Sequence, residues 1–225
     1  MSRLPPDLAR RFRSGRPCLD LVHTGGDGEL AKWEIIHGPD DLARFLGVIL
    51  GLGAVRATAE DVADMRLLRS AITQIAYGLA AEAFPRAADV VIVNRYAATS
   101  PLAPALVPAD PASSQADRTR AFETADAPSS PPRPGACGDV GPLPRVSVRA
   151  AVIDPAAPAA LATLARDAVD LFSGPLASRI RVCAAVDCGL LLVDTSRPGR
   201  RRWCSMQRCG NRAKIREHRA RRTAD

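Results

Sequence analysis

Four cysteines near the end of the chain constrain its fold more than any other feature. Four residues separate Cys183 from Cys188, four separate Cys204 from Cys209, and fifteen lie between the two pairs. Two short loops spaced in this way can bring four thiolates to one point, and zinc prefers a tetrahedron of such ligands. The spacing therefore predicts a structural zinc site, for which iron or an iron–sulfur cluster is the alternative occupant.

Disulfide bonds are the other explanation of paired cysteines. The first thirty residues contain basic residues and prolines but lack the apolar run of a signal peptide. We therefore expect a cytoplasmic chain that does not enter a membrane. Thiols stay reduced in that compartment, which favours metal over disulfides.

The residues around the cysteines predict a small finger. Residues 190–193 are typical of a short strand, 197–199 of a turn and 200–203 of a returning strand. Asn211 can cap a helix over 212–222, which has no Gly or Pro to interrupt it. This order of loop, β-hairpin and helix is that of a treble-clef-like zinc finger. We expect its small core to contain Trp203, Met206 and Ile215.

The same segment resembles a known family. The run Cys209-Gly210-Asn211-Arg212, preceded by RRWCSM at 201–206 and DTSR at 194–197, is similar to the CGNR zinc finger family of bacterial proteins. The resemblance covers residues 179–225 and implies that all four cysteines are zinc ligands. Members are described as transcriptional regulators with a helical N-terminal domain called ABATE. The resemblance therefore implies a zinc-dependent regulator whose helical domain senses a ligand or dimerises.

The distribution of charge indicates nucleic acid independently. Residues 179–225 contain 13 Lys and Arg against 4 acidic residues, whereas residues 1–178 contain 18 against 20. A compact basic module beside a near-neutral domain is typical of a phosphate-binding surface, so we expect duplex DNA as the partner. Base readout would come from Asn211, Arg212 or Arg216. The complete predicted nucleic-acid surface is Arg200, Arg201, Arg202, Asn211, Arg212, Lys214, Arg216, Arg219, Arg221 and Arg222.

Two other functions remain open at this stage. The finger could dock on an acidic protein surface, or it could bind RNA or the ribosome. Trp203 is its only aromatic residue, so it lacks the stacking platforms of a single-strand binder. We expect no enzyme, because the chain contains no phosphate-binding glycine loop, nucleophile elbow or zinc-protease motif. Cys18 and His23 could form a nucleophile and its base, but no third orienting group is identifiable.

The remaining sequence predicts a mainly α fold with one or two short strands. Residues 1–17 are expected to be flexible, and 18–178 to form the helical ABATE-like domain, a possible homodimer interface. An apolar stripe at Val62, Met65, Leu68, Ile72, Ile75 and Leu79 predicts its clearest helix. Asp154 and Pro155 predict the start of another helix, and alternation over 146–152 predicts a strand. A Pro-, Ala- and Ser-rich insertion at about 99–145 contains Cys137 and is expected to be disordered.

Overall fold

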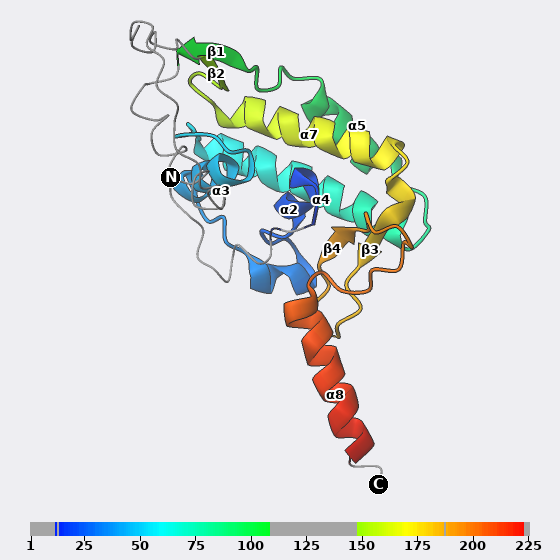
Figure 1. Cartoon of the computed structure of the whole chain (residues 1–225). Helices are drawn as coiled ribbons and strands as arrows, with labels where there is room; N and C mark the ends of the chain where they lie inside the picture. Colours follow the sequence, from blue (N-terminus) through cyan, green and yellow to red (C-terminus); the bar gives the residue numbers. More distant parts are fainter. Residues whose placement is uncertain (1–11, 13, 109–147, 187, 223–225) are drawn as a thin grey trace, which may run out of the picture. The chain divides into compact units, whose positions relative to one another are not determined.

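The computed structural model describes residue 12 and residues 14–108, 148–186 and 188–222, and these residues are mainly helical (Figure 1). The chain divides into two compact units, one formed by Met1–Leu102 with Asp154–Asp225 and the other by Ala103–Ile153. No helix in the described part of the chain is long and apolar enough to cross a membrane. The elements follow in the order α2 (Pro17–Val22), η1 (Gly28–Trp33), α3 (Pro39–Ile49), α4 (Ala59–Ala80), α5 (Ala87–Ala97), β1 (Ala105–Pro108), β2 (Val148–Ala151), α7 (Ala157–Ser173), η2 (Ala177–Arg179), β3 (Ile180–Val182), β4 (Leu191–Val193), η3 (Met206–Gly210) and α8 (Asn211–Arg222).

Helix α4 is the centre of the larger unit. It begins with a capping box, in which the Thr58 hydroxyl accepts a hydrogen bond from the Asp61 amide while the Asp61 carboxylate accepts one from the Thr58 amide. The predicted stripe faces the core: all of its members are buried except Leu79, which is partly buried. Helices α2, α3, α5 and α7 all contact α4.

The segment that leads into α2 is ordered, contrary to the prediction of a flexible end up to residue 17. Ser14 is 1% exposed, and its amide donates to a carboxylate oxygen of Asp20 at 3.1 Å. Arg16 forms ion pairs with Asp167 at 2.8 Å and Asp170 at 2.6 Å, both on α7. Arg16 therefore fixes the segment to the helical core. Residues 1–11 and 13 lie outside the described residues.

Helix α7 starts later than Asp154 and Pro155 predict. Asp154 adopts a left-handed conformation with φ of 47°, and both of its carboxylate oxygens accept hydrogen bonds from Arg56 at 2.8 Å. This pairing takes Asp154 away from the helix end, so α7 begins at Ala157 with Pro158 in its first turn. Its apolar face packs against α4.

The smaller unit contains one antiparallel pair of strands. Ala105 pairs with Ala151 and Pro108 with Val148, so β2 lies within the strand predicted at 146–152. Strand β1 occupies four residues inside the predicted insertion, at 105–108. Residues 109–147, including Cys137, lie outside the described residues.

The finger also contains an antiparallel pair, but its partner strand is not the predicted one. Strand β4 pairs with β3, with Ile180 opposite Val193 and Val182 opposite Leu191. Residues 200–203 form no strand. The loop after β4 instead folds back so that Ser196 and the Arg201 amide donate hydrogen bonds to the carboxylate of the buried Asp194. Helix α8 follows η3 directly, and Asn211 has helical φ and ψ of −66° and −40°, so it is not an N-cap.

Candidate metal centre and basic surface

The four cysteines of the finger converge. Cys183 follows β3, Cys188 precedes a left-handed turn at Gly189, Cys204 lies in an irregular segment and Cys209 lies in η3. Their sulfur atoms all lie within 4.8 Å of one another. The separations of Cys204 Sγ from Cys188 Sγ and Cys209 Sγ are 3.6 and 3.5 Å. The structure therefore brings together all four predicted ligands.

This donor set fits a tetrahedral metal ion. Zinc–sulfur bonds of about 2.3 Å place tetrahedral sulfurs about 3.8 Å apart, close to the separations observed. The same separations are too long for a disulfide, whose sulfurs lie about 2 Å apart. Cys183, Cys188 and Cys209 are buried, and Cys204 is half-buried. A buried set of four soft ligands is complete, so the arrangement is that of a structural site without an open position.

Hydrogen-bond donors surround the sulfurs. The Cys204 amide points at Cys183 Sγ at 3.4 Å, and an Arg212 nitrogen lies 3.7 Å from Cys209 Sγ. Hydrogen bonds from the thiols of Cys188 and Cys204 lower the pKa of Cys183 well below its ordinary value, and the shared proton raises the pKa of Cys188 to about 11. The thiols therefore favour negative charge at Cys183 alone, and a divalent metal would displace the protons of its other ligands when it binds.

Asp194 organises the loop between the two cysteine pairs. One carboxylate oxygen accepts from the Ser196 hydroxyl at 2.6 Å and the Ser196 amide at 3.0 Å, and the other accepts from the Arg201 amide at 2.8 Å. The Ser196 hydroxyl, together with the Arg201 amide, lowers the pKa of Asp194 below its ordinary value. Asp194 lies in the DTSR motif, but the sequence alone did not predict its role. A short Asp-x-Ser motif is nevertheless a common arrangement for closing a loop.

Arg201 supports the metal centre, which the sequence did not predict. Its guanidinium donates to the carbonyl oxygen of Trp203 at 3.1 Å and to that of Cys204 at 2.6 Å. The prediction placed Arg201 on the nucleic-acid surface. In the structure its guanidinium instead binds backbone carbonyl groups within the finger, including that of Cys204, a candidate metal ligand.

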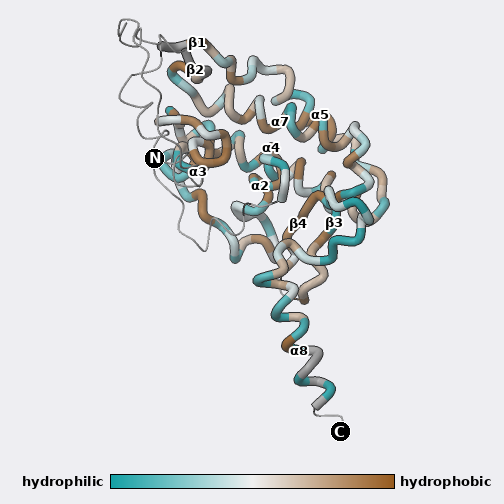
Figure 2. The backbone as a smooth tube through the Cα atoms, in the orientation of Figure 1, coloured by the Kyte–Doolittle hydropathy of each residue, from teal (hydrophilic) through white to brown (hydrophobic). Residues whose placement is uncertain are grey.

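The other predicted contact residues lie at the surface. Arg200 and Arg202 are exposed, and the Arg202 guanidinium lies 4.9 Å from the centre of the Trp203 ring. On α8 the described residues are mostly hydrophilic (Figure 2). Met206 and Ile215, predicted to lie in the finger core, are each 51% exposed, because Leu190, Leu192 and the cysteines form that core instead. The side chain of Arg222 lies outside the described residues; the exposed predicted residues of α8 are Asn211, Arg212, Lys214, Arg216, Arg219 and Arg221.

The finger is joined to the helical core by hydrogen bonds and by shared packing. The Leu191 amide donates to His23 Nε2 at 3.1 Å, and the Tyr77 hydroxyl donates to the Gly189 carbonyl at 2.6 Å. Ile180, Leu191 and Val193 pack within the main hydrophobic core. Sequence reasoning missed this role of His23, whose isolation on an apolar segment gave no signal of its partner.

Cys18 is inaccessible in this core. It is fully buried, and burial raises its pKa well above the ordinary value. Its amide donates to Asp167 at 2.9 Å, and the Nε2 atom of nearby His23 accepts from Leu191. The arrangement is not that of an activated thiol and its base.

Comparison with known families assigns the helical core and the finger to two different family models. Residues 15–175 match ABATE, described as "Putative stress-induced transcription regulator", and residues 179–222 match the CGNR zinc finger. No curated protein matches the chain. The resemblance predicted from the cysteine segment is confirmed by both matches.

Proposed function

Because the chain belongs to the ABATE family and carries a CGNR zinc finger, we propose that it is a zinc-dependent DNA-binding protein that regulates transcription. One observation carries the proposal. Four sulfurs meet within 4.8 Å directly before a helix whose described side chains are mostly basic and exposed. A metal held there would fix the orientation of that helix, and the helix would present its charges to phosphates.

Cys183, Cys188, Cys204 and Cys209 would hold the ion. Zinc, when bound, supplies a cross-link between two loops whose own core is small. Arg212 and the Cys204 amide would stabilise the thiolate ligands through the hydrogen bonds described above. Arg201 would hold the Cys204 backbone, so we assign it to the metal centre and not to the DNA surface.

Exposed residues on two segments would contact the DNA. Arg200 and Arg202 precede the second cysteine pair, and α8 adds basic residues at helical spacing. Phosphate contacts of this kind position a protein, whereas base contacts give specificity. Asn211, Arg212 and Arg216 lie toward the N-terminal end of α8 and are the proposed base-reading residues.

One finger contacts few base pairs, so specific regulation would require two copies. We propose that the region 18–178 forms a homodimer, which would place two fingers on a palindromic site in cytoplasmic DNA. The same region is the proposed sensor of a small-molecule effector.

The test combines binding selection with a salt series. Duplexes selected from a random pool would be titrated by fluorescence anisotropy, and the affinity of the wild-type chain should fall steeply as salt rises. Arg216→Gln and Arg219→Gln should each lower the salt slope by about 0.9 if each residue contacts one phosphate. Arg44→Gln on α3 removes the same charge from an exposed residue elsewhere and should leave the slope unchanged.

The same assay tests whether binding depends on zinc and distinguishes DNA binding from protein docking and RNA binding. Cys204→Ser with Cys209→Ser should abolish zinc and duplex binding together. Absence of duplex binding at low salt by a zinc-loaded chain would contradict the proposal and favour docking on an acidic protein. Preferential binding of single-stranded or A-form RNA would favour the RNA-binding alternative.

A further inference from the structure

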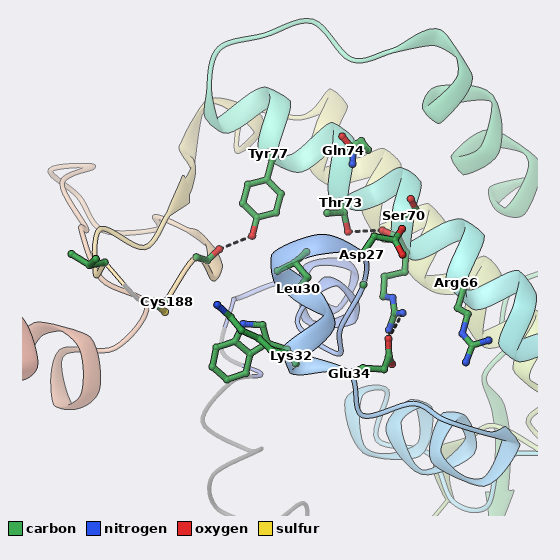
Figure 3. A pocket seen from close by; sticks show the side chains of 15 residues that line it. Asp27, Leu30, Lys32, Glu34, Arg66, Ser70, Thr73, Gln74, Tyr77 and Cys188 are labelled. Atoms are coloured by element: carbon green, nitrogen blue, oxygen red, sulfur yellow. Dashed lines mark hydrogen bonds and ion pairs between the residues drawn. The ribbon is translucent and has the colours of Figure 1, made fainter.

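A cavity of about 750 Å³ lies where α4, the segment around η1 and the first cysteine loop meet (Figure 3). We define the first cysteine loop as residues 183–186 together with Cys188 and Gly189. The cavity lies within the size range of small-molecule sites. Residues from both family regions line it, including Trp33, Tyr77 and Cys188.

The α4 wall makes the cavity elongated. Arg66, Ser70, Thr73, Gln74 and Tyr77 recur at helical spacing and therefore lie along one side of the helix (Figure 3). Tyr77 lies eleven positions after Arg66, which corresponds to about 16 Å along an α-helix. A ligand that fills the cavity would therefore be longer than it is wide.

One end of this wall is cationic. Arg69 is 4% exposed, and its charge is paired with Glu34 at 2.6 Å. Arg66 is exposed beside that pair, and in the described part of the chain no carboxylate lies within ion-pair distance of it. Its guanidinium is close enough to contribute to the lowered pKa of Glu34, after the opposing effect of burial and the larger contribution of Arg69. Arg66 can therefore pair with an anionic group of a ligand.

The other end is more apolar. Leu30 lies across the cavity from α4, and the ring of Tyr77 lies toward the finger (Figure 3). Trp33 and Val186 add apolar surface to the lining. Cys188 sulfur is also at this end. Lys32 also lines this end, but its ammonium lies over the Trp33 ring, 5.8 Å from the ring centre. The thiolates proposed to hold the metal disfavour an anion there, so the negative group of a ligand belongs at the Arg66 end.

We propose that this cavity binds an elongated amphipathic carboxylic acid, with its carboxylate on Arg66 and its apolar tail along Leu30 and Trp33 toward Tyr77. The tail would reach the first cysteine loop, where the Tyr77 hydroxyl holds the Gly189 carbonyl at 2.6 Å. Occupancy would therefore stabilise the loop that carries Cys183 and Cys188. Its effect on the finger rests on the proposed function, whereas the binding itself does not.

Binding is tested with three probes of equal length and different charge. The full-length, ¹⁵N-labelled chain would be titrated with 6-phenylhexanoate, 6-phenylhexanamide and 6-phenylhexylamine, and chemical shifts would be followed at the amides of the lining residues. The carboxylate should bind tightest. Arg66→Gln should weaken it roughly tenfold, as expected for loss of a charged hydrogen bond. Arg44→Gln should leave the affinity unchanged.

Several results would overturn this assignment. They are equal affinity for the three probes, preference for the amine through Asp27, shifts confined to residues outside the cavity, or no binding at millimolar concentration. Because no DNA is present, a chain that binds the carboxylate but not DNA would refute only the proposed function. A chain that binds DNA but none of the probes would refute only this inference.

Coupling to the finger has its own readout. In the zinc-loaded chain, 6-phenylhexanoate should slow zinc transfer to a chromogenic chelator at least twofold. Tyr77→Phe removes the hydroxyl that holds the Gly189 carbonyl, so it should abolish the slowing when the cavity is saturated with the carboxylate. An equal slowing in Tyr77→Phe, or no slowing in the wild type, would contradict the route through Gly189.

Discussion

The ion pair between Arg69 and Glu34 makes a sharp test of how the helical core is held together. Arg69 donates to both carboxylate oxygens of Glu34, at 3.1 and 2.6 Å, and to the Thr24 hydroxyl at 2.9 Å. Its side chain is 5% exposed, whereas that of Glu34 is 22% exposed. The perturbation is Glu34→Ala, which leaves a buried guanidinium without its counter-charge.

Because Glu34 is more exposed than Arg69, replacing one or the other should lower the free energy of unfolding by different amounts. Removing one partner of a buried ion pair costs about 3–5 kcal/mol, and the partial exposure of Glu34 places Glu34→Ala near about 3 kcal/mol. Arg69→Met should cost about 1–2 kcal/mol, because the remaining carboxylate reaches water and still accepts from the Ile36 amide. The double variant Glu34→Leu with Arg69→Met should lie closer to the wild type than Glu34→Ala does.

Urea unfolding followed by far-ultraviolet circular dichroism measures these free energies, with zinc held constant. The m value should not change, since the same surface is exposed on unfolding. If Glu34→Ala cost less than Arg69→Met, the premise that the buried cation depends on this carboxylate would be wrong.

The pair also predicts a pH dependence. Burial alone would raise the pKa of Glu34, but hydrogen bonds from Arg69 and the Ile36 amide outweigh it and lower the pKa below the ordinary value. The stabilisation is therefore complete above the unfolded-state pKa of about 4.3 and is lost as the pH falls through the folded-state pKa. The Glu34→Ala variant should therefore lack this loss of stability at acidic pH.

Three further predictions concern a glycine, a buried carboxyl group and the metal. Gly25→Ala should destabilise the chain by about 2 kcal/mol or more, because φ is +142° and the new Cβ would lie 2.6 Å from the Glu34 Cα atom; Gly53→Ala, with nothing within 4 Å, should cost less than about 1 kcal/mol in the same urea assay. Burial raises the pKa of Asp20 to about 6, so the wild type should lose stability relative to Asp20→Asn as the pH rises from about 4 through 6, and the opposite trend would refute the shift. Elemental analysis should find one zinc per chain, and its removal by a chelator should lower the α8 helix signal and the melting temperature, whereas a metal-free chain with unchanged stability would contradict a structural site.

Local signals in the sequence predicted much of the helical core. The stripe from Val62 to Leu79 and the capping pair of Thr58 and Asp61 determine α4, because both depend on residues three or four positions apart. The cysteine spacing predicted the four sulfurs that meet in the finger for a similar reason: each pair lies in one short loop.

Features that depend on distant partners were not predictable from pattern. Residues 200–203 have strand-like composition, but Asp194 captures the Arg201 amide and prevents pairing. Asp154 was expected to cap α7, but it pairs with Arg56, which lies far away in the sequence. The cavity joins α4, η1 and the first cysteine loop, and no single segment of the chain carries a signal for it.

Because Ile180, Leu191 and Val193 pack in the main hydrophobic core, the finger cannot be deleted without damage to that core. Excising the residues from 179 onward would leave three unfilled spaces in the remaining domain, and the detached fragment would expose the same three side chains to water. Grafting the finger onto another scaffold would require a matching floor, including acceptors equivalent to His23 and the Ser14 carbonyl. The finger of a protein built in this way cannot be exchanged independently, because substitutions at these three positions require matching substitutions in the helical core.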